Sequence, residues 1–255
     1  MADALEPILP VDQLFDARGT VDQEGSAPVW MPHHQGDVFS GVGMPGVDDS
    51  DENYAMLFMH PCTMRNGVVL KPNVTVIRVR QHSARKRLLD QPADWADNFK
   101  VMPLPDMLGN GTDTFFADFM SIATVNSKML DRANRVARFS LPGRAQFQQR
   151  IIYHMTRFAP SVDVLESATA AVEEELALQE DWVGASMRAA GDGCGDVERS
   201  EAAFDAYMSS ATEISPLTRG DHELLESSSR RELMDSKYQR RVSAEVRTYI
   251  ARTFP

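Results

Sequence analysis

Short apolar runs separated by turn residues occupy the first half of the chain. Six of these runs have the length and the β-branched or aromatic content of strands: 38–42, 54–60, 74–79, 99–104, 114–119 and 134–139. Gly, Pro, Asn and Asp fill the gaps between them, and Asn66-Gly67 predicts a tight turn. Short strands with such turns predict a small barrel or a curled antiparallel sheet.

The hydrophobic period changes to that of a helix at Ser140. Ser140 is the predicted N-cap of this helix, and Pro142 is expected in its first turn, where proline is tolerated. Pro160 predicts where the helix ends. Apolar side chains recur along it at helical spacing, at Phe147, Ile151, Met155 and Phe158. Three further helices are predicted: one over 165–183, one over 197–211, and a last one that begins at the capping box 229–232.

These patterns predict the α+β class, with a small antiparallel, barrel-like β domain followed by a mainly helical C-terminal region. We assign the β domain to 31–140 and the helical region to 141–255. Residues 1–30 mix Pro, Asp, Gly and short apolar pairs without a sustained period. They predict a flexible N-terminal arm with a brief helix near 11–17.

The composition of the 255 residues is that of a globular protein, since 43% are hydrophobic and 25% are charged. No apolar run approaches the ~20 residues that cross a bilayer, and the first residues lack the basic and apolar regions of a signal peptide. The two cysteines, Cys62 and Cys194, do not indicate a disulfide framework. We therefore expect no membrane association and a reducing, cytoplasmic location.

Charge is unevenly distributed along the chain, whose net charge is −11. Residues 1–55 hold 11 acidic residues and one basic residue, 56–160 hold 7 acidic and 15 basic residues, and 161–255 hold 19 acidic and 10 basic residues. The basic middle predicts a surface that binds anions. The alternative is that the acidic C-terminal helices pair with these arginines and neutralise them.

Groups capable of chemistry follow directly on the apolar run 54–60. The candidate catalytic residues are His60, Cys62, Thr63 and Arg65, because a nearby base or cation turns a thiol into a nucleophile. The alternative is a thiol packed in the core, since free cysteines are among the most buried residues. No oxyanion-hole motif accompanies the cluster.

Neither a metal site nor a cofactor is predicted. His33, His34, Asp37, His60 and Cys62 carry suitable ligand atoms. Their spacing lacks the paired Cys-x₂₋₄-Cys or His-x₃₋₅-His pattern that is typical of zinc sites.

Arginine-rich positions form the candidate binding surface, because a planar guanidinium can donate two hydrogen bonds to one phosphate. The candidate binding residues are Arg78, Arg80, Arg85, Lys86, Arg87, Arg150, His154 and Arg157. Arg132, Arg135 and Arg138 extend this basic series before the first long helix. The pattern of Phe115, Phe116 and Phe119 is typical of core residues, so no platform for base stacking is predicted.

The order Gln35-Gly36-Asp37-Val38-Phe39, a loop, the apolar run 55–60 and a Val/Ile-rich strand resembles the start of the MazF/PemK-like growth inhibitors, over residues 35–80. Members of that family are small SH3-like barrels, so the resemblance implies this fold for the front of the chain and a bacterial source. Those that cleave RNA use an arginine in the first loop and a Ser or Thr near a later strand end. Residues 41–53 contain no arginine, whereas Thr63 and Arg65 lie near a predicted strand end.

We expect a bacterial accessory or interaction protein whose basic central surface binds nucleic acid or an acidic protein partner. Two enzymatic alternatives stay open, namely a toxin-like endoribonuclease of barrel fold and a cysteine-dependent hydrolase that uses Cys62. The pattern of residues predicts no oligomeric state.

Overall fold

The computed structural model describes residues 5–20, 23, 25–45, 53–81, 98–111, 114–191, 195–209 and 229–254. Arg85, Lys86 and Arg87 lie outside the described residues, as does Cys194. As far as they are described, 1–29, 33–66 and 70–168 form one compact unit, and 30–32, 67–69 and 169–255 form a second. Whether 31–140 and 141–255 fold as separate domains stays a prediction. In the described part of the chain, every helix is too short or too polar to span a membrane.

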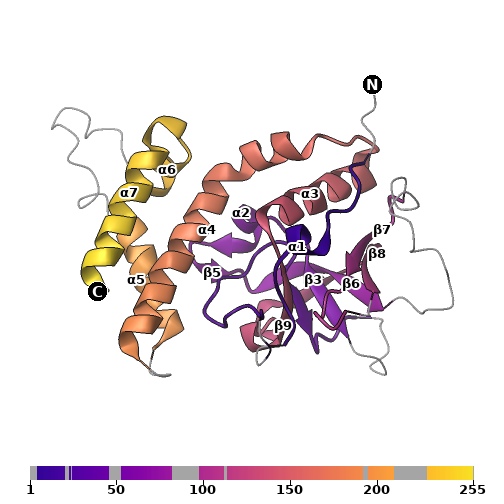
Figure 1. Ribbon diagram of the computed structural model, residues 1–255, viewed down its shortest axis with the longest axis horizontal. Coiled ribbons are helices and arrows are strands. Elements are labelled where there is room, and N and C mark those ends of the chain that lie inside the picture. Colours follow the sequence, from indigo (N-terminus) through magenta and orange to yellow (C-terminus); the bar gives the residue numbers. More distant parts are fainter. Residues whose placement is uncertain are drawn as a thin grey trace. The chain divides into compact units, whose positions relative to one another are not determined.

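A seven-stranded antiparallel sheet forms the centre of the first unit, which confirms the predicted α+β class (Figure 1). The strands follow the order β1-β9-β2-β3-β6-β8-β7 from edge to edge, so the sheet is an open half-barrel. Their bounds are Phe15–Arg18 (β1), Val38–Ser40 (β2), Tyr54–Leu57 (β3), Asn73–Gln81 (β6), Val101–Pro105 (β7), Thr114–Asn126 (β8) and Arg135–Phe139 (β9). Two further strands, Arg65–Asn66 (β4) and Val69–Leu70 (β5), pair around the predicted Asn66-Gly67 turn.

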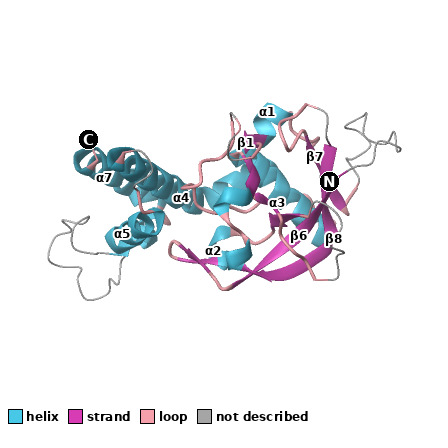
Figure 2. Ribbon diagram, turned by 90° about the horizontal axis from the view of Figure 1, so that it is seen from below, coloured by secondary structure: helices cyan, strands magenta, loops and turns pink. Residues whose placement is uncertain are grey.

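All six predicted strands are present, but the sequence missed two features of the sheet. The helix expected near 11–17 is only the short α1 (Val11–Leu14), and Phe15 begins the edge strand β1, which pairs with β9. The strand predicted over 114–119 continues to Asn126 and forms a long curved pair with β6 (Figure 2).

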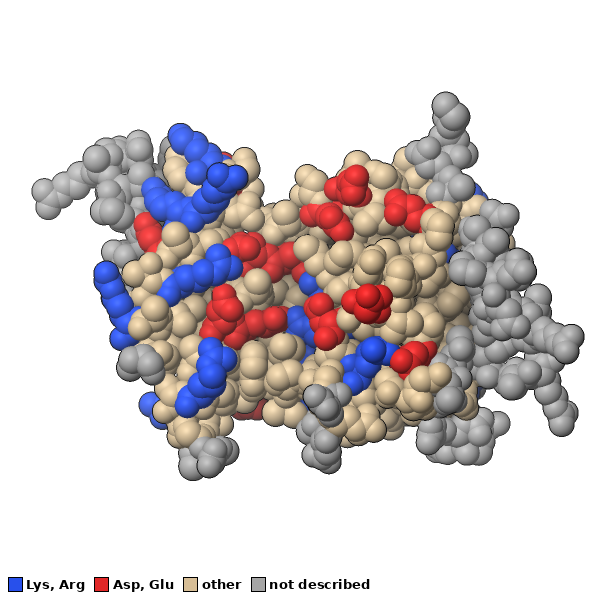
Figure 3. All heavy atoms as spheres, in the orientation of Figure 1, with Lys and Arg blue, Asp and Glu red and all other residues tan. Residues whose placement is uncertain are grey.

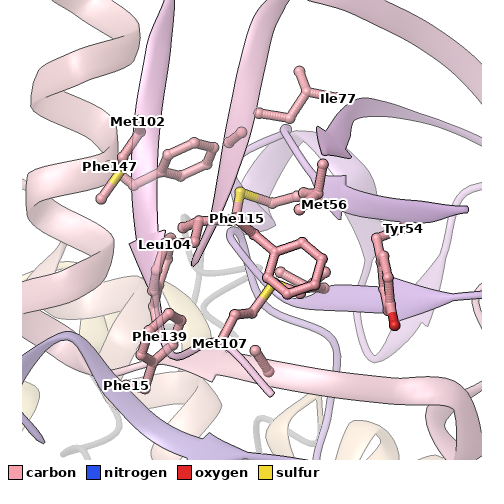
Figure 4. Packing of buried hydrophobic residues seen from close by; sticks show 14 of the residues in the cluster. Phe15, Tyr54, Met56, Ile77, Met102, Leu104, Met107, Phe115, Phe139 and Phe147 are labelled. Carbon is pink, nitrogen blue, oxygen red and sulfur yellow. The ribbon is translucent and has the colours of Figure 1, made fainter. Parts of the chain in front are cut away.

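Helices cover both faces of the sheet, but at different ends of the long strands: α3 (Leu141–Thr156) covers one face, and the short helix α2 (Pro61–Met64) helps to cover the other. Helix α3 packs Phe147 against the first face, in a cluster with Ile77 and Phe115 (Figure 4). Successive strand residues point to opposite faces, so Val76 points to the other face, where it packs in a second cluster with Met64. Met64 is the last residue of α2, which therefore helps to cover that second face.

Helix α3 begins where the sequence predicts. The Ser140 side chain accepts a hydrogen bond from the Gly143 amide at 3.0 Å, which confirms the N-cap. The helix ends at Thr156, before Pro160, and Arg157 caps it in the left-handed conformation at φ 63°. Its predicted apolar stripe is buried only in part, because Phe147 is fully buried while Met155 and Phe158 are more than half exposed.

Residues 5–9, expected as part of a flexible arm, lie against α3 and are held by its glutamines. The Gln146 amide accepts from the Leu9 N–H at 3.1 Å and donates to the Pro7 carbonyl at 2.6 Å. Gln149 accepts from the Glu6 N–H at 3.2 Å. The Glu6 carboxylate in turn accepts from the amide of Val162, the first residue of α4 (Val162–Ala190).

The second unit is helical. Besides the greater part of α4, its described helices are α5 (Val197–Ser209), α6 (Ser229–Leu233) and α7 (Ser236–Thr253). Trp182 of α4 stacks on Tyr249 of α7 at 5.2 Å and packs with Phe204 of α5 in one core. The last helix does not begin at the capping box 229–232, which opens only α6; Asp235 caps α7 by accepting from the Lys237 amide at 2.9 Å.

Candidate functional site

The candidate catalytic thiol lies on the surface of the first unit. His60 is the N-cap of α2, and its Nδ1 atom lies 2.9 Å from the Cys62 Sγ atom. The Thr63 hydroxyl lies 3.8 Å from the same sulfur. Cys62 is exposed, so the alternative of a thiol packed in the core does not hold.

The backbone amides at the start of α2 point at His60. The Thr63 and Met64 amides donate to the His60 carbonyl at 2.9 and 3.1 Å, and the Cys62 amide donates to His60 Nδ1 at 3.4 Å. Acyl transfer needs donors directed at a developing oxyanion. These three amides are already used, so the turn supplies a thiol and an imidazole but no oxyanion hole.

Arg65, the fourth catalytic candidate, is buried and belongs to a different cluster, which also contains His33 and His34. Burial lowers the pKa of His33 to about 3, and the charges of Arg132 and, more weakly, Arg65 act in the same direction. Burial also lowers the pKa of His34 well below its ordinary value. Both imidazoles are therefore neutral at physiological pH.

The ring nitrogens of His33 are occupied by the protein itself. Nε2 lies 2.8 Å from the Leu130 carbonyl oxygen, and Nδ1 accepts from Arg132 Nε at 3.4 Å. The ring stacks on Phe39 at 5.5 Å. Across the described residues, no three His, Cys, Asp or Glu side chains are grouped so that they could hold a metal ion.

Asp37 forms a buried ion pair instead of a metal site. Its carboxylate lies 2.9 Å from Arg135 Nη1, and both side chains are fully buried. The same carboxylate accepts from the His34 amide at 3.0 Å. Burial lowers the pKa of Arg135, which the charge of Asp37 partly restores. Arg135 is therefore part of the fold, not of a binding surface.

Arg150 is also inside the first unit. Only 1% of it is exposed, its Nη2 donates to the Glu6 carbonyl at 3.4 Å, and burial lowers its pKa to about 10. An arginine in this position cannot reach a ligand on the surface. We therefore leave Arg150 out of the candidate binding surface.

His154 and Arg157 lie near the end of α3 and contact Phe99. His154 Nδ1 lies 2.7 Å from the Phe99 carbonyl oxygen, and the His154 ring packs on Phe119 at 5.5 Å. The Arg157 guanidinium lies 3.6 Å from the centroid of the Phe99 ring, and its Nη1 donates to the Tyr153 carbonyl at 3.0 Å. Both side chains thus fix the end of the helix against the start of β7.

Arg78 and Arg80 lie on the other face of the sheet from α3. They alternate along β6 with Ile77 and Val79, which are buried in the core under α3. Opposite them on β8 lie Asp118, which pairs with Arg78 in the register, and Phe116, which pairs with Arg80. We call the four residues Arg78, Arg80, Phe116 and Asp118 the arginine face.

A bulge in β8 fixes the geometry of the arginine face. The partner of Ile77 is Ile122, but the partner of Arg78 is Asp118, so 119–121 form the bulge. The Asp118 carboxylate accepts from the Met120 amide at 3.0 Å and forms an ion pair with Arg80 at 2.9 Å. Arg80 remains 44% exposed, so the pair holds the guanidinium in place at the surface.

Phe116 differs from the other two phenylalanines of its run. Phe115 and Phe119 are 1% exposed in the core under α3, whereas Phe116 is half-buried on the arginine face. In a strand, successive side chains point to opposite faces, so Phe115 and Phe119 share one face and Phe116 lies on the other. This alternation is the signal in the sequence that distinguishes Phe116. Phe116 is therefore not a core residue, contrary to the prediction, and its ring lies beside two arginines.

The acidic C-terminal residues pair with arginines of their own unit. Arg230 contacts Glu175 at 2.7 Å and Asp205 at 2.6 Å. Arg247 contacts Glu174 at 3.2 Å and Asp181 at 3.3 Å. These four carboxylates are therefore engaged within the helical unit.

Neither the known protein families nor the curated proteins contain a match to this chain.

Proposed function

We propose that the protein binds single-stranded nucleic acid through the arginine face. The observation that carries the proposal is the placement of Arg78 and Arg80 on one side of β6, away from the core, beside Phe116. Phosphates attract guanidinium groups, and unstacked bases stack on aromatic side chains at the surface of a sheet. The arginine face offers both contacts on one strand pair.

Single-stranded nucleic acid suits this surface better than an acidic protein. Every base has a face that can stack on Phe116, and a strand supplies one phosphate per nucleotide along β6. Among the described residues Arg78 makes no ion pair, so its charge is available to a phosphate. The chain after β6 carries Arg85, Lys86 and Arg87, which add positive charge close by in the sequence.

Fluorescence anisotropy with a labelled single-stranded RNA of mixed sequence, over a series of salt concentrations, tests the proposal. The variant Arg78→Ala/Arg80→Ala should bind more weakly, and the slope of log affinity against log salt should fall by about 0.7 for each lost phosphate contact. Phe116→Leu should weaken binding by about 1–3 kcal/mol per stacked base at every salt concentration and leave the slope unchanged.

The charge-matched control is Lys71→Ala/Lys128→Ala, which removes two exposed lysines from other parts of the first unit. It should change the affinity much less than the arginine variant. If the wild-type protein does not bind RNA at low salt, or binds polyglutamate more tightly, the proposal is wrong.

A second candidate, a cysteine-dependent hydrolase, is favoured by the 2.9 Å contact between His60 Nδ1 and Cys62 Sγ. An imidazole at that distance can take the thiol proton, which would produce the nucleophile. Hydrolysis of a panel of activated esters should then disappear in Cys62→Ala and persist in Cys194→Ala. Equal rates in the two variants exclude this candidate. The RNA from the binding assay, separated on a denaturing gel, tests for cleavage in the same experiment.

A further inference from the structure

Helix α7 has one broad exposed face that carries basic side chains with only small residues between them. Its apolar stripe, Val242, Val246 and Ile250, is buried in the core of the second unit. On the opposite side, at a helical repeat of 3.6 residues, the chain places five cations and three small residues. They are Lys237, Arg240, Arg241, Arg247 and Arg252, with Ala244, Thr248 and Ala251 between them.

Two of these five cations are already paired. Arg241 contacts Glu232 at 3.1 Å and Glu245 at 3.8 Å, and Arg247 bridges two carboxylates of α4. Among the described residues, the exposed Lys237, Arg240 and Arg252 make no ion pair. Figure 3 shows Lys and Arg gathered over α7 and Asp and Glu gathered over α4.

The three unpaired cations are spread over the exposed side of the helix: at ~100° per residue, Lys237 lies between Arg240 and Arg252 around the axis, about 60° from each. Lys237 and Arg252 are fifteen residues apart, which corresponds to about 22 Å at ~1.5 Å per residue. Ala244 and Ala251 lie in the same face and are too small to keep a ligand at a distance. A cationic face on a rigid helix matches a ligand with regularly repeated negative charge.

We propose that α7 binds the phosphate backbone of double-stranded nucleic acid, independently of sequence and separately from the arginine face. A duplex carries one negative charge per ~1.7 Å of its axis, so cations spread over one side of a helix can contact phosphates on both edges of a groove. The apolar face of α7 is buried in the core, so the helix has no large hydrophobic side chain left for insertion into a membrane.

A second copy of the chain is a weaker candidate for the occupant. On α4, Glu174, Glu175 and Asp181 already contact Arg247 or Arg230 within the same unit. A second copy that used these three carboxylates would have to break their ion pairs. A duplex needs no such exchange, because it only releases bound salt cations.

The test uses the full chain with a labelled DNA duplex of mixed sequence in fluorescence anisotropy, over a series of salt concentrations. Lys237→Ala/Arg240→Ala/Arg252→Ala should weaken duplex binding on the order of tenfold or more at low salt. The salt slope should fall by about 0.9 per lost phosphate contact, or about 2.7 in all. Alanine favours helices, so the variant should keep α7, which circular dichroism will check.

The control Lys128→Ala/Arg188→Ala/Arg199→Ala removes the same charge from exposed positions outside α7 and should leave the salt slope unchanged. Equal effects of the two triple variants overturn the proposal, as does tighter binding to polyglutamate or to anionic vesicles than to the duplex. The arginine-face variant separates the two surfaces: Arg78→Ala/Arg80→Ala should keep duplex binding, and the α7 variant should keep single-strand binding.

Discussion

Several residues that look reactive in the sequence stabilise the fold. His33, His34 and Asp37 carry the ligand atoms of a metal site, yet all three are buried; the His33 ring contacts the Leu130 carbonyl oxygen, and the Asp37 carboxylate contacts Arg135. An unpaired buried charge costs several kcal/mol, about 3–5 when one partner of a buried ion pair is removed. Asp37 and Arg135 therefore have to be kept together for stability, whatever the chain binds.

The burial of His33 predicts how stability depends on pH. Its pKa in the folded protein is about 3, below the ordinary value of 6.5, so the folded state excludes a proton that the unfolded state takes up. The neutral His33 side chain contributes in full to the free energy of unfolding above about pH 6.5. This contribution is lost as the pH falls toward about 3, at up to ~1.4 kcal/mol per pH unit. Urea unfolding at a series of pH values measures this loss.

The variant His33→Gln isolates the contribution of this residue. A glutamine amide can still donate to the Leu130 carbonyl but takes up no proton. The variant should be less stable at neutral pH, because it loses the stacking on Phe39, and should lose less stability on acidification. An unchanged slope of unfolding free energy against pH would show that other groups, such as His34, cause the acid sensitivity.

At the scale of elements, α3 is unusual because residues 143–150 are buried all round the helix. The sheet packs on one side of it, and residues 5–9 and α1 lie on others. Its polar side chains, Gln146 and Gln149, therefore hold neighbouring backbone and do not face water. Helical periodicity alone predicts an exposed polar face there, because it cannot reveal that a second segment of chain covers that face.

This crowding predicts the effect of a substitution at Gly143, in the first turn of α3. Alanine normally stabilises a helix by about 0.5–1 kcal/mol relative to glycine. Here a Cβ atom would lie 2.2 Å from the Leu14 carbonyl oxygen, which belongs to the backbone and cannot move easily. Gly143→Ala should therefore lower the stability by about 1–3 kcal/mol, as overpacking does, and thermal unfolding measures it.

Gly43→Ala is the matched control for this prediction. Among the described residues, a Cβ atom at Gly43 would meet the methyl group of Met129, at the ordinary distance of 3.6 Å. The control should change the melting temperature little. If both variants are equally stable, the contact between α3 and α1 is looser than the structure indicates.

The strands that the sequence predicts correctly are those with a local signal. Val74, Val76, Ile77 and Val79 are β-branched and lie in one run, so β6 follows from the residues themselves. Strand β1 has a single large apolar residue, Phe15, and exists because it pairs with β9, more than a hundred residues away in the chain. The second half of β8 is likewise specified by its partner β6.

At the scale of the whole molecule, the charge profile predicted a basic middle but not which of its arginines reach the surface. Arg135 and Arg150 are buried, whereas Arg78 and Arg80 alternate with core residues and lie on the face of β6 that α3 does not cover, beyond the second cluster. That alternation was present in the sequence once β6 was assigned. The ion pair with Asp118 was not, since it depends on the bulge between two distant strands.

In the helical unit, the charge profile likewise fails to predict the surface, because a basic face lies within an acidic segment. A run with an excess of acidic residues ends in a helix whose exposed face is basic, because its acidic partners on α4 take up only some of its arginines. Net charge over 161–255 hides this face. A helical projection of 236–253 would have found it, since the buried stripe of α7 is unambiguous.

One end of the β6–β8 pair is buried on the face that α3 covers, and the other end is buried on the opposite face. This arrangement affects how strictly the register of the pair is specified during folding. A slip of one residue in a strand sends every side chain to the other face. In β6, such a slip would take Val76 out of one core and Ile77 out of the other, and would direct Arg78 toward the face that α3 covers. Because a single error is penalised in two cores at once, the long strand pair excludes its own misregistered forms more strongly than a sheet with one buried face.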